Sequence, residues 1–254
     1  NPNSGLLGLH LEGPYINPVK RGAHLLEHIK QPTLDEVKLL LDKSEGVVKM
    51  MTLAPEQCSD EVIQLLVDNN VIVSAGHSNA TYEQATAGFN KGITTATHLF
   101  NAMSPLEGRA LGMVGAVYDH ATVHSSIVCD GLHTSFAAVR ISKKMMQERL
   151  FLITDAVTDV REGAYQHVLK DDRYVLPDGT LSGSALTMIK AVNNCVNEAG
   201  IEFDEALRMA SLYPARAAQL QGFGKIEEGY KADLVILSKE REIKAVIRNG
   251  VLCN

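Results

Sequence analysis

The sequence lacks a long apolar run, paired cysteines and a signal-peptide pattern at its first residues. No apolar run approaches the roughly twenty residues that a transmembrane helix needs. The four cysteines, Cys58, Cys129, Cys195 and Cys253, are far apart, which argues against a disulfide framework or a cysteine zinc site. We therefore expect a soluble protein with reduced thiols, located in the cytoplasm.

The sequence also lacks an excess of either charge. Its 24 basic and 30 acidic residues give a net charge of -6, and no basic block is present. A nucleic-acid-binding or anionic-membrane surface therefore has no compositional support, and a small-molecule partner is favoured. With 254 residues, 45% of them hydrophobic, the chain suits one large globular domain or one domain with an appendage.

Short apolar, β-branched runs alternate with helical patterns, which is typical of βα units around a parallel sheet. Three helix starts are predicted from their caps, Thr33 with Glu36, Ser59, and Thr81 with Gln84. The six expected strands are "LLGLHLEG", "VVKMMTLAP", "VIVSAGH", "TTATHLF", "HSSIVCDG" and "LFLITDA".

The pattern changes after the sixth run. Residues 162–183 are expected to form a polar insertion with a hairpin around Pro177-Asp178-Gly179. Helices over 185–200 and 203–220 follow, and residues 229–254 alternate like antiparallel strands. The expected division is a barrel domain over 1–222 and the C-terminal strands of a small β-sandwich over 223–254.

Polar side chains stand where the apolar runs end. In parallel α/β folds, catalytic groups sit at the carboxyl ends of the strands. Read in this way, the sequence places the following residues at or just past those ends: Glu12, Glu56, His77, His98, His133 and Asp155. A carboxylate and two neutral imidazoles suit zinc or another divalent transition metal, with a position left for water. A carboxylate off the metal could accept a proton from that water.

The motifs "GLHLEGPYINPVKRGAH", "LAPE", "SAGHSNAT", "THLFNAM", "GRALG", "DGLH", "ITDA" and "GTLSGSALTMI" follow one another in this order. Together they resemble the N-acetylglucosamine-6-phosphate deacetylase family of the amidohydrolase superfamily. Each motif alone is weak, but the ordered set extends over nearly the whole chain and is specific to a family.

The resemblance implies an α/β fold, a (β/α)8 TIM-like barrel of the amidohydrolase type with a small β-sandwich appendage. Only six barrel strands are found, so the first two of the family's strands are missing. An open sheet would expose two edges that closure hides. The missing strands have three possible explanations: a truncated form of the protein, part of a chain given as the whole, or a naturally shortened gene product. We favour the first two, in which the chain is a fragment of a longer protein.

The resemblance also implies the site. It places a divalent cation on Glu12, His77 and His98, with zinc favoured and iron, cobalt or manganese possible. Asp155 matches the general base that acts on metal-activated water and then protonates the amine. His24 matches a histidine that polarises the acetyl carbonyl of N-acetylglucosamine 6-phosphate.

The phosphate is expected to bind Asn101, Ala102, Arg109 and His133, of which Arg109 would reach the neighbouring site of a homodimer. A guanidinium, an imidazole and amide donors suit a dianion. Two alternatives remain, an amidohydrolase that acts on another amide and a non-catalytic truncated remnant.

Other polar residues are given structural roles or none. Glu56 is expected to fix a loop or to cap the helix at Ser59, and His10 to pack or to lie behind the site residues. No role is assigned to the histidines without convergent partners, His28, His120, His124 and His167.

Overall fold

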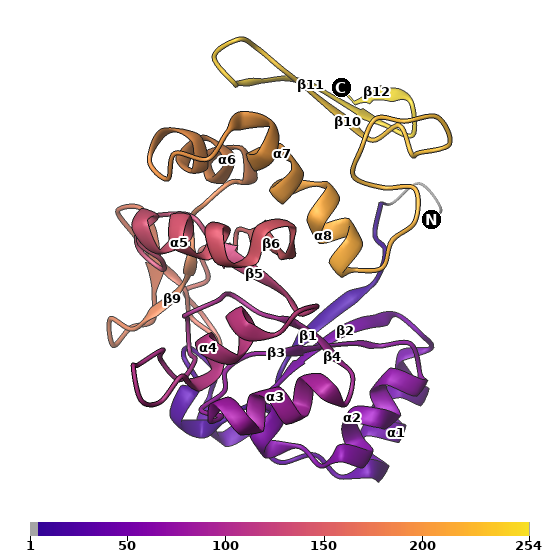
Figure 1. The fold of residues 1–254 in the computed structure, drawn as a ribbon, viewed down its shortest axis with the longest axis vertical. Helices are drawn as coiled ribbons and strands as arrows, with labels where there is room; N and C mark the ends of the chain where they lie inside the picture. Colours follow the sequence, from indigo (N-terminus) through magenta and orange to yellow (C-terminus); the bar gives the residue numbers. More distant parts are fainter. Residues whose placement is uncertain (1–4, 254) are drawn as a thin grey trace.

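A six-stranded parallel sheet organises the chain in the computed structural model, which describes residues 5–253 (Figure 1). Neighbours in the sheet are neighbours in sequence, as expected for successive βα units. The parallel sheet predicted from the apolar runs is confirmed. Its strands are β1 (Leu9–Glu12), β2 (Val48–Leu53), β3 (Ile72–Ala75), β4 (Ile93–Ala96), β5 (His124–Val128) and β6 (Leu150–Ile153).

Three helices between the early strands begin at their predicted caps. The capping boxes of Thr33 with Glu36 and of Thr81 with Gln84 are both present, and the Ser59 side chain accepts a hydrogen bond from Val62. Such caps pair backbone N–H groups that the first helical turn leaves free. These helices are α1 (Leu34–Ser44), α2 (Asp60–Asp68) and α3 (Tyr82–Asn90).

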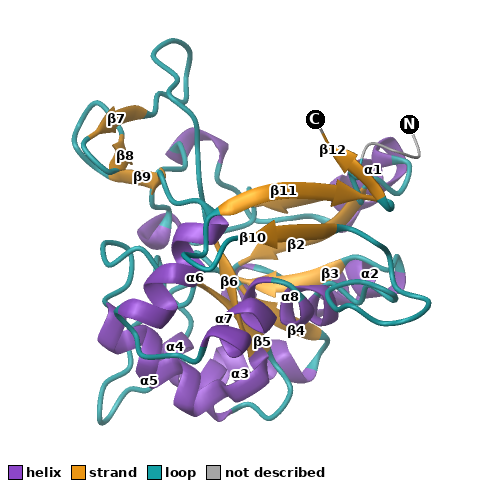
Figure 2. Cartoon of the chain, turned by 90° about the horizontal axis from the view of Figure 1, so that it is seen from above, coloured by secondary structure: helices purple, strands orange, loops and turns teal. Residues whose placement is uncertain are grey.

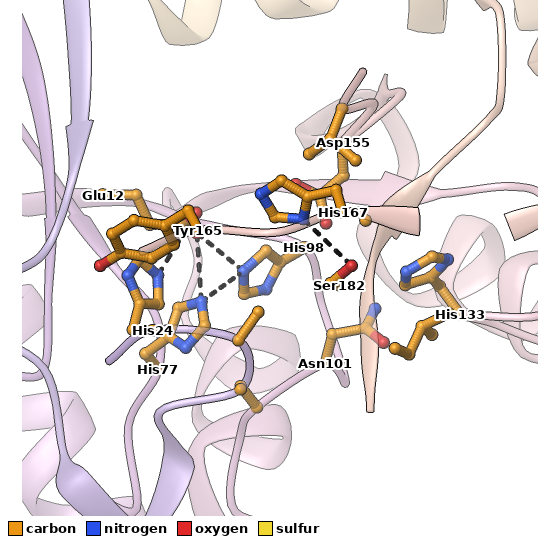
Figure 3. Close-up of a pocket in the computed structure, with 16 residues that line it drawn as sticks. Glu12, His24, His77, His98, Asn101, His133, Asp155, Tyr165, His167 and Ser182 are labelled. Atoms are coloured by element: carbon orange, nitrogen blue, oxygen red, sulfur yellow. Dashed lines mark hydrogen bonds and ion pairs between the residues drawn. The ribbon is translucent and has the colours of Figure 1, made fainter. Parts of the chain in front are cut away.

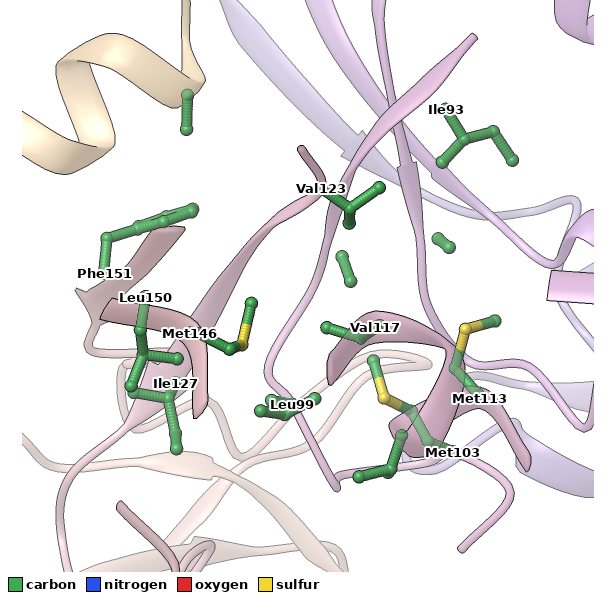
Figure 4. Close-up of a cluster of buried hydrophobic side chains, with 14 of the residues drawn as sticks. Ile93, Leu99, Met103, Met113, Val117, Val123, Ile127, Met146, Leu150 and Phe151 are labelled. Atoms are coloured by element: carbon green, nitrogen blue, oxygen red, sulfur yellow. The ribbon is translucent and has the colours of Figure 1, made fainter. Parts of the chain in front are cut away.

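Two further helices, α4 (Gly112–Asp119) and α5 (Phe136–Met146), follow β4 and β5. Residues 112–118 of α4 are all buried, so this helix has no polar face and no amphipathic pattern to reveal it. Its side chains belong to the main hydrophobic core, where Met113, Val117, Leu99 and Leu150 lie among neighbouring apolar groups (Figure 4). Truncating a fully buried side chain of this kind to alanine costs about 2–5 kcal/mol.

The polar insertion after β6 forms a small antiparallel sheet of β7 (Val168–Lys170), β8 (Arg173–Val175) and β9 (Leu181–Ser184). The predicted hairpin at Pro177-Asp178-Gly179 is confirmed: Leu176 N–H donates to the Thr180 carbonyl, and Gly179 has a φ of 87°. Glycine adopts this left-handed backbone without steric cost.

The two predicted helices that follow are shorter than expected. The first begins at Met188, not Ala185, because the Thr187 side chain caps it, and it forms α6 (Met188–Asn197). The predicted helix over 203–220 is divided at Ser211 into α7 (Phe203–Ala210) and α8 (Leu212–Ala217). Pro214 has no N–H to continue the hydrogen-bond ladder of α7, which accounts for the break.

The chain ends in a separate antiparallel sheet of β10 (Leu234–Leu237), β11 (Ile243–Arg248) and β12 (Val251–Cys253). This sheet overlaps the parallel one in the view of Figure 2, but Figure 1 shows it above α7 and α8, apart from strands β1–β4. The predicted antiparallel strands are confirmed, whereas the division into 1–222 and 223–254 stays a prediction. Among the described residues, no helix is long and apolar enough to cross a membrane.

The two edges of the described parallel sheet differ. Helices α6, α7 and α8 contact β6, whose side chains are mostly buried. The β1 edge is open, and Leu9 on it is 46% exposed. Strands β1 and β6 are the two terminal strands of this sheet, as expected for an open sheet, and the side chains of β1 are the more exposed.

Candidate active site and metal centre

A pocket of about 360 Å³ lies at the carboxyl ends of the parallel strands (Figure 3). Its walls come from β1 and from the turns after β3, β4, β5 and β6, so residues far apart in sequence meet there. All the predicted site residues except Arg109 line it, namely Glu12, His24, His77, His98, Asn101, Ala102, His133 and Asp155.

Three of these side chains converge on one point (Figure 3). Glu12 Oε1 lies 2.9 Å from His98 Nε2 and 3.2 Å from His77 Nε2, and the two imidazole nitrogens are 3.0 Å apart. His77 and His98 are 6% and 3% exposed. One oxygen and two nitrogens thus form a compact triangle, in which the two histidines are buried and the Glu12 side chain is 32% exposed.

The backbone turns sharply at several of these positions. His77, His98, Ala102 and Asp155 have φ values of 47°, 39°, 49° and 51°, in the left-handed region that non-glycine residues rarely adopt. Such strain clusters at functional sites, where the surrounding structure imposes it. Here His77, His98 and Asp155 lie just past their strands, and the turn directs each side chain into the pocket.

The tautomer of His77 follows from its second nitrogen. Nδ1 lies 2.8 Å from the carbonyl oxygen of Lys20, which can only accept, so Nδ1 carries the proton. In the neutral ring, the lone pair is then on Nε2, the atom facing Glu12 and His98. Gly22 packs against the same ring, since a Cβ at that position would lie 3.2 Å from His77 Cε1.

The electrostatics of the triangle favour positive charge. Burial alone would raise the pKa of Glu12, but the imidazoles of His24, His77 and His98 around its carboxylate hold that pKa well below its ordinary range. Burial would lower the pKa of His98, yet Glu12 and the charge of Asp155 raise it. The pocket therefore holds carboxylate charge that a cation can neutralise.

His24 lies on the open side of the triangle. Its Nε2 is 3.8 Å from Glu12 Oε2, and its ring meets His77 edge-on with centroids 4.7 Å apart. Glu12, His24 and His77 also offer ligand atoms within 4.8 Å of one another. The atoms of Glu12, His77 and His98 are closer together, so that set fits a single ion better.

Asp155 follows β6 and faces the same space (Figure 3). Its carbonyl oxygen accepts a hydrogen bond from Ser184 N–H at 2.8 Å, which attaches this turn to the end of β9. Because its side chain is neither among the three converging atoms nor fully buried, Asp155 is free to contact a bound molecule.

His133 and the loop of Asn101 and Ala102 form another part of the wall. His133 Nδ1 lies 2.6 Å from Asp130 Oδ2, so it donates to this carboxylate and leaves Nε2 for the pocket. Burial would raise the pKa of Asp130, but hydrogen bonds from His133 and Leu132 hold it below its usual range. These groups fix the orientation of the His133 ring.

Arg109 does not reach the pocket of its own chain. It lies in an exposed loop between β4 and α4. This placement differs from that of the other phosphate-binding candidates, and its predicted role in a neighbouring subunit stays a prediction.

Sequence reasoning missed several lining residues, among them Tyr165 and His167. His167 was assigned no role, yet its Nδ1 lies 3.1 Å from Ser182 Oγ, and its backbone pairs with Val160. Tyr165 stacks on His28 with ring centroids 6.4 Å apart. Only the folding of the insertion over the strand ends brings these side chains to the pocket, so no local pattern announces them.

Comparison with known proteins identifies similar chains. The profile of the amidohydrolase family matches residues 3–253. The chain is 38% identical over 258 residues to N-acetylglucosamine-6-phosphate deacetylase of Haemophilus influenzae, covering 96% of this chain and 66% of that protein. It is 35% identical to N-acetylgalactosamine-6-phosphate deacetylase of Shewanella sp., covering 98% and 65%.

A solved structure is similar throughout. The crystal structure of N-acetylglucosamine-6-phosphate deacetylase from Pasteurella multocida superposes with a TM-score of 0.93 at 38% identity, covering all of this chain and 68% of that one. The chain thus spans 65–66% of the length of the two curated relatives. The similarity extends over the described fold, including the strand ends that surround the pocket.

Proposed function

Because the chain belongs to the amidohydrolase family, we propose that it is part of a metal-dependent deacetylase that hydrolyses N-acetylglucosamine 6-phosphate to glucosamine 6-phosphate and acetate. The observation that carries this proposal is the convergence of Glu12, His77 and His98 beside Asp155. The proposal concerns the whole protein, of which this chain matches about two thirds.

The three converging residues fit a divalent transition metal. A tetrahedral ion at about 2.0–2.2 Å from its ligands holds them about 3.3–3.6 Å apart, a little farther than the 2.9–3.2 Å seen here. The tautomer of His77 supports ligation, since its Nε2 carries the lone pair. Two imidazoles and one carboxylate suit zinc first, and also iron, cobalt or manganese.

When bound, the cation would supply Lewis-acid polarisation of the acetyl carbonyl and lower the pKa of water. Asp155 accepts the proton of the attacking water and returns it to the amine nitrogen. The return is needed because an amine is too poor a leaving group to depart as its anion, so one side chain serves as base and then as acid. His24 would donate a hydrogen bond to the acetyl oxygen.

Phosphate recognition is assigned to His133 with Asn101 and Ala102. Nε2 of His133 is available because Asp130 engages the other nitrogen. The Shewanella relative favours a second candidate substrate, N-acetylgalactosamine 6-phosphate, which carries the same acetamide and phosphate on another sugar. A cytoplasmic location and a homodimer also belong to this proposal.

The proposal is tested by quantifying bound metal and acetate release from both phosphorylated sugars. Unphosphorylated N-acetylglucosamine is the matched control, since it has the same amide and no dianion. We expect about one metal per chain and a kcat/KM far higher for a phosphorylated sugar. Metal binding without acetate release from either, or equal rates with the control, would contradict the assignment.

Arg109→Ala is expected to lower kcat/KM for the phosphorylated sugar by about 10–150-fold, the equivalent of losing a charged hydrogen bond of about 1.5–3 kcal/mol. Mixing this variant with Asp155→Asn tests whether Arg109 of one subunit acts in the active site of the other. In a mixed dimer, one site combines Asp155 of its own chain with Arg109 of the other, so activity returns. If Arg109 acts within its own chain, both mixed sites stay defective.

A further inference from the structure

Glu56 is a carboxylate that the chemistry proposed above does not use. It lies just after β2, on the short 3-10 turn Pro55–Gln57. Its Oε1 accepts hydrogen bonds from Asn17 Nδ2 at 2.9 Å and from Asn79 N–H at 2.7 Å, and its Oε2 accepts one from Ser78 Oγ at 2.7 Å. The loop-fixing role expected from the sequence is confirmed.

These bonds join the loops that follow β1, β2 and β3. The loop after β3 contains His77, and the loop after β1 contacts it. Ser78 and Asn79 are the next two residues after His77 along the chain. On the other side, Asn17 N–H donates to the His77 carbonyl at 2.9 Å. Glu56 therefore holds the backbone on both sides of the His77 peptide.

The contact with Asn17 extends to the imidazole itself. Asn17 Oδ1 accepts from Val19 N–H and caps the 3-10 turn Pro18–Lys20. The last carbonyl of that turn, at Lys20, is the acceptor of His77 Nδ1–H. Glu56 thus fixes the acceptor that sets the tautomer of His77, and also the backbone that carries its ring.

We propose that Glu56 is a positioning residue for the metal centre, which keeps His77 in its Nδ1–H tautomer with Nε2 directed at Glu12 and His98. This inference rests on the proposed metal site, but not on the identity of the substrate. Partners beyond the ligands orient ligating histidines in this way, and their loss typically weakens metal binding about 10–100-fold. Glu56 differs from such direct partners because it acts through a carbonyl and a loop.

Only a carboxylate can accept all three hydrogen bonds, because the neighbouring groups of Asn17, Ser78 and Asn79 are all donors. Glutamine keeps Oε1 for Asn17 and Asn79 and presents an NH₂ group to Ser78 Oγ, which must then accept. Glu56→Gln should therefore show a smaller defect than Glu56→Ala, which removes both acceptor oxygens and with them all three hydrogen bonds. Asn17→Asp is a second, isosteric variant that keeps the cap on Val19 and places a carboxylate oxygen against Glu56.

The test has two readouts that do not depend on catalysis. In the metal-free protein, ¹H–¹⁵N NMR of labelled histidines reports the tautomer, with the His77 resonances assigned from their absence in His77→Ala. Chelator competition with cobalt or zinc gives the metal dissociation constant. We expect Glu56→Ala and Asn17→Asp to lose the pure Nδ1–H signature and to raise the dissociation constant about 10–100-fold.

Thr33→Ala is the matched control, since it removes the cap of α1 and lowers stability without touching the site. It should leave the His77 signature and the metal affinity unchanged. If Glu56→Ala fails to fold, Asn17→Asp decides the question. Wild-type tautomer and wild-type metal affinity in the folded variants would overturn the proposal, whereas failure of acetate release alone would count only against the proposed function.

Discussion

Asp155→Asn is expected to lower kcat by about 10²–10⁴-fold, the range for loss of a general acid–base group, while the metal content stays that of the wild type. The amide is nearly isosteric with the carboxylate but cannot accept a proton near neutral pH. Asparagine also tolerates the φ of 51° at this position, so the turn and its hydrogen bond from Ser184 should persist.

The measurement is acetate release under saturating substrate, with bound metal determined on the same preparation. KM should change little, because the residues proposed to hold the phosphate and the acetyl oxygen remain. Loss of metal in this variant would mean that Asp155 is a ligand. Turnover close to that of the wild type would mean that another group is the base, and His167, which lines the same pocket, would be examined next.

His77→Ala is expected to abolish stoichiometric metal binding and, with it, turnover. It removes one of the three proposed ligand atoms, which lie within 3.2 Å of one another, at a position that is only 6% exposed. The loss of affinity should exceed the roughly 10–100-fold effect of removing a partner beyond the ligands. Activity and metal content therefore fall together, unlike in Asp155→Asn.

Thermal unfolding with and without added metal gives an independent measure. At a free metal concentration of 100 times the dissociation constant, binding stabilises a protein by about 2.7 kcal/mol. The wild type should show the corresponding rise in Tm, and His77→Ala should not. His120→Ala, whose ring lies outside the pocket and packs against Phe89, should respond like the wild type. An equal rise in Tm for His77→Ala would exclude this histidine as a ligand.

Much of the fold could be predicted because the relevant patterns are local. Apolar runs that end on Glu12, His77 and Asp155 mark strand ends, and Thr33 and Thr81 mark helix starts. Two helices were not predicted correctly. Helix α4 has no polar face, and the helix expected over 203–220 is interrupted near Pro214, where a missing N–H outweighs the helical propensity of the flanking residues.

The site was predictable only in part, for a related reason. Parallel strands in sequence order bring their carboxyl ends to one end of the sheet, so Glu12, His77 and His98 could be expected there. Their direct contact also needs the left-handed turns at His77 and His98, because β2 lies between β1 and β3. The insertion that carries Tyr165 and His167 is not part of that repeat. Its position over the pocket depends on long-range contacts that leave no periodic trace in the sequence.

The sequence by itself therefore determined the positions of the strands along the chain, the capped helices and the donor types at the strand ends, because each depends on residues close together in the chain. Only the tertiary structure decided the tautomer of His77 and the three hydrogen bonds to Glu56. It also decided that Arg109 is not among the described residues that line the pocket of its own chain. Those features depend on how separate loops pack against one another, and a hydrogen bond forms only when the donor–acceptor distance is right to within a few tenths of an ångström.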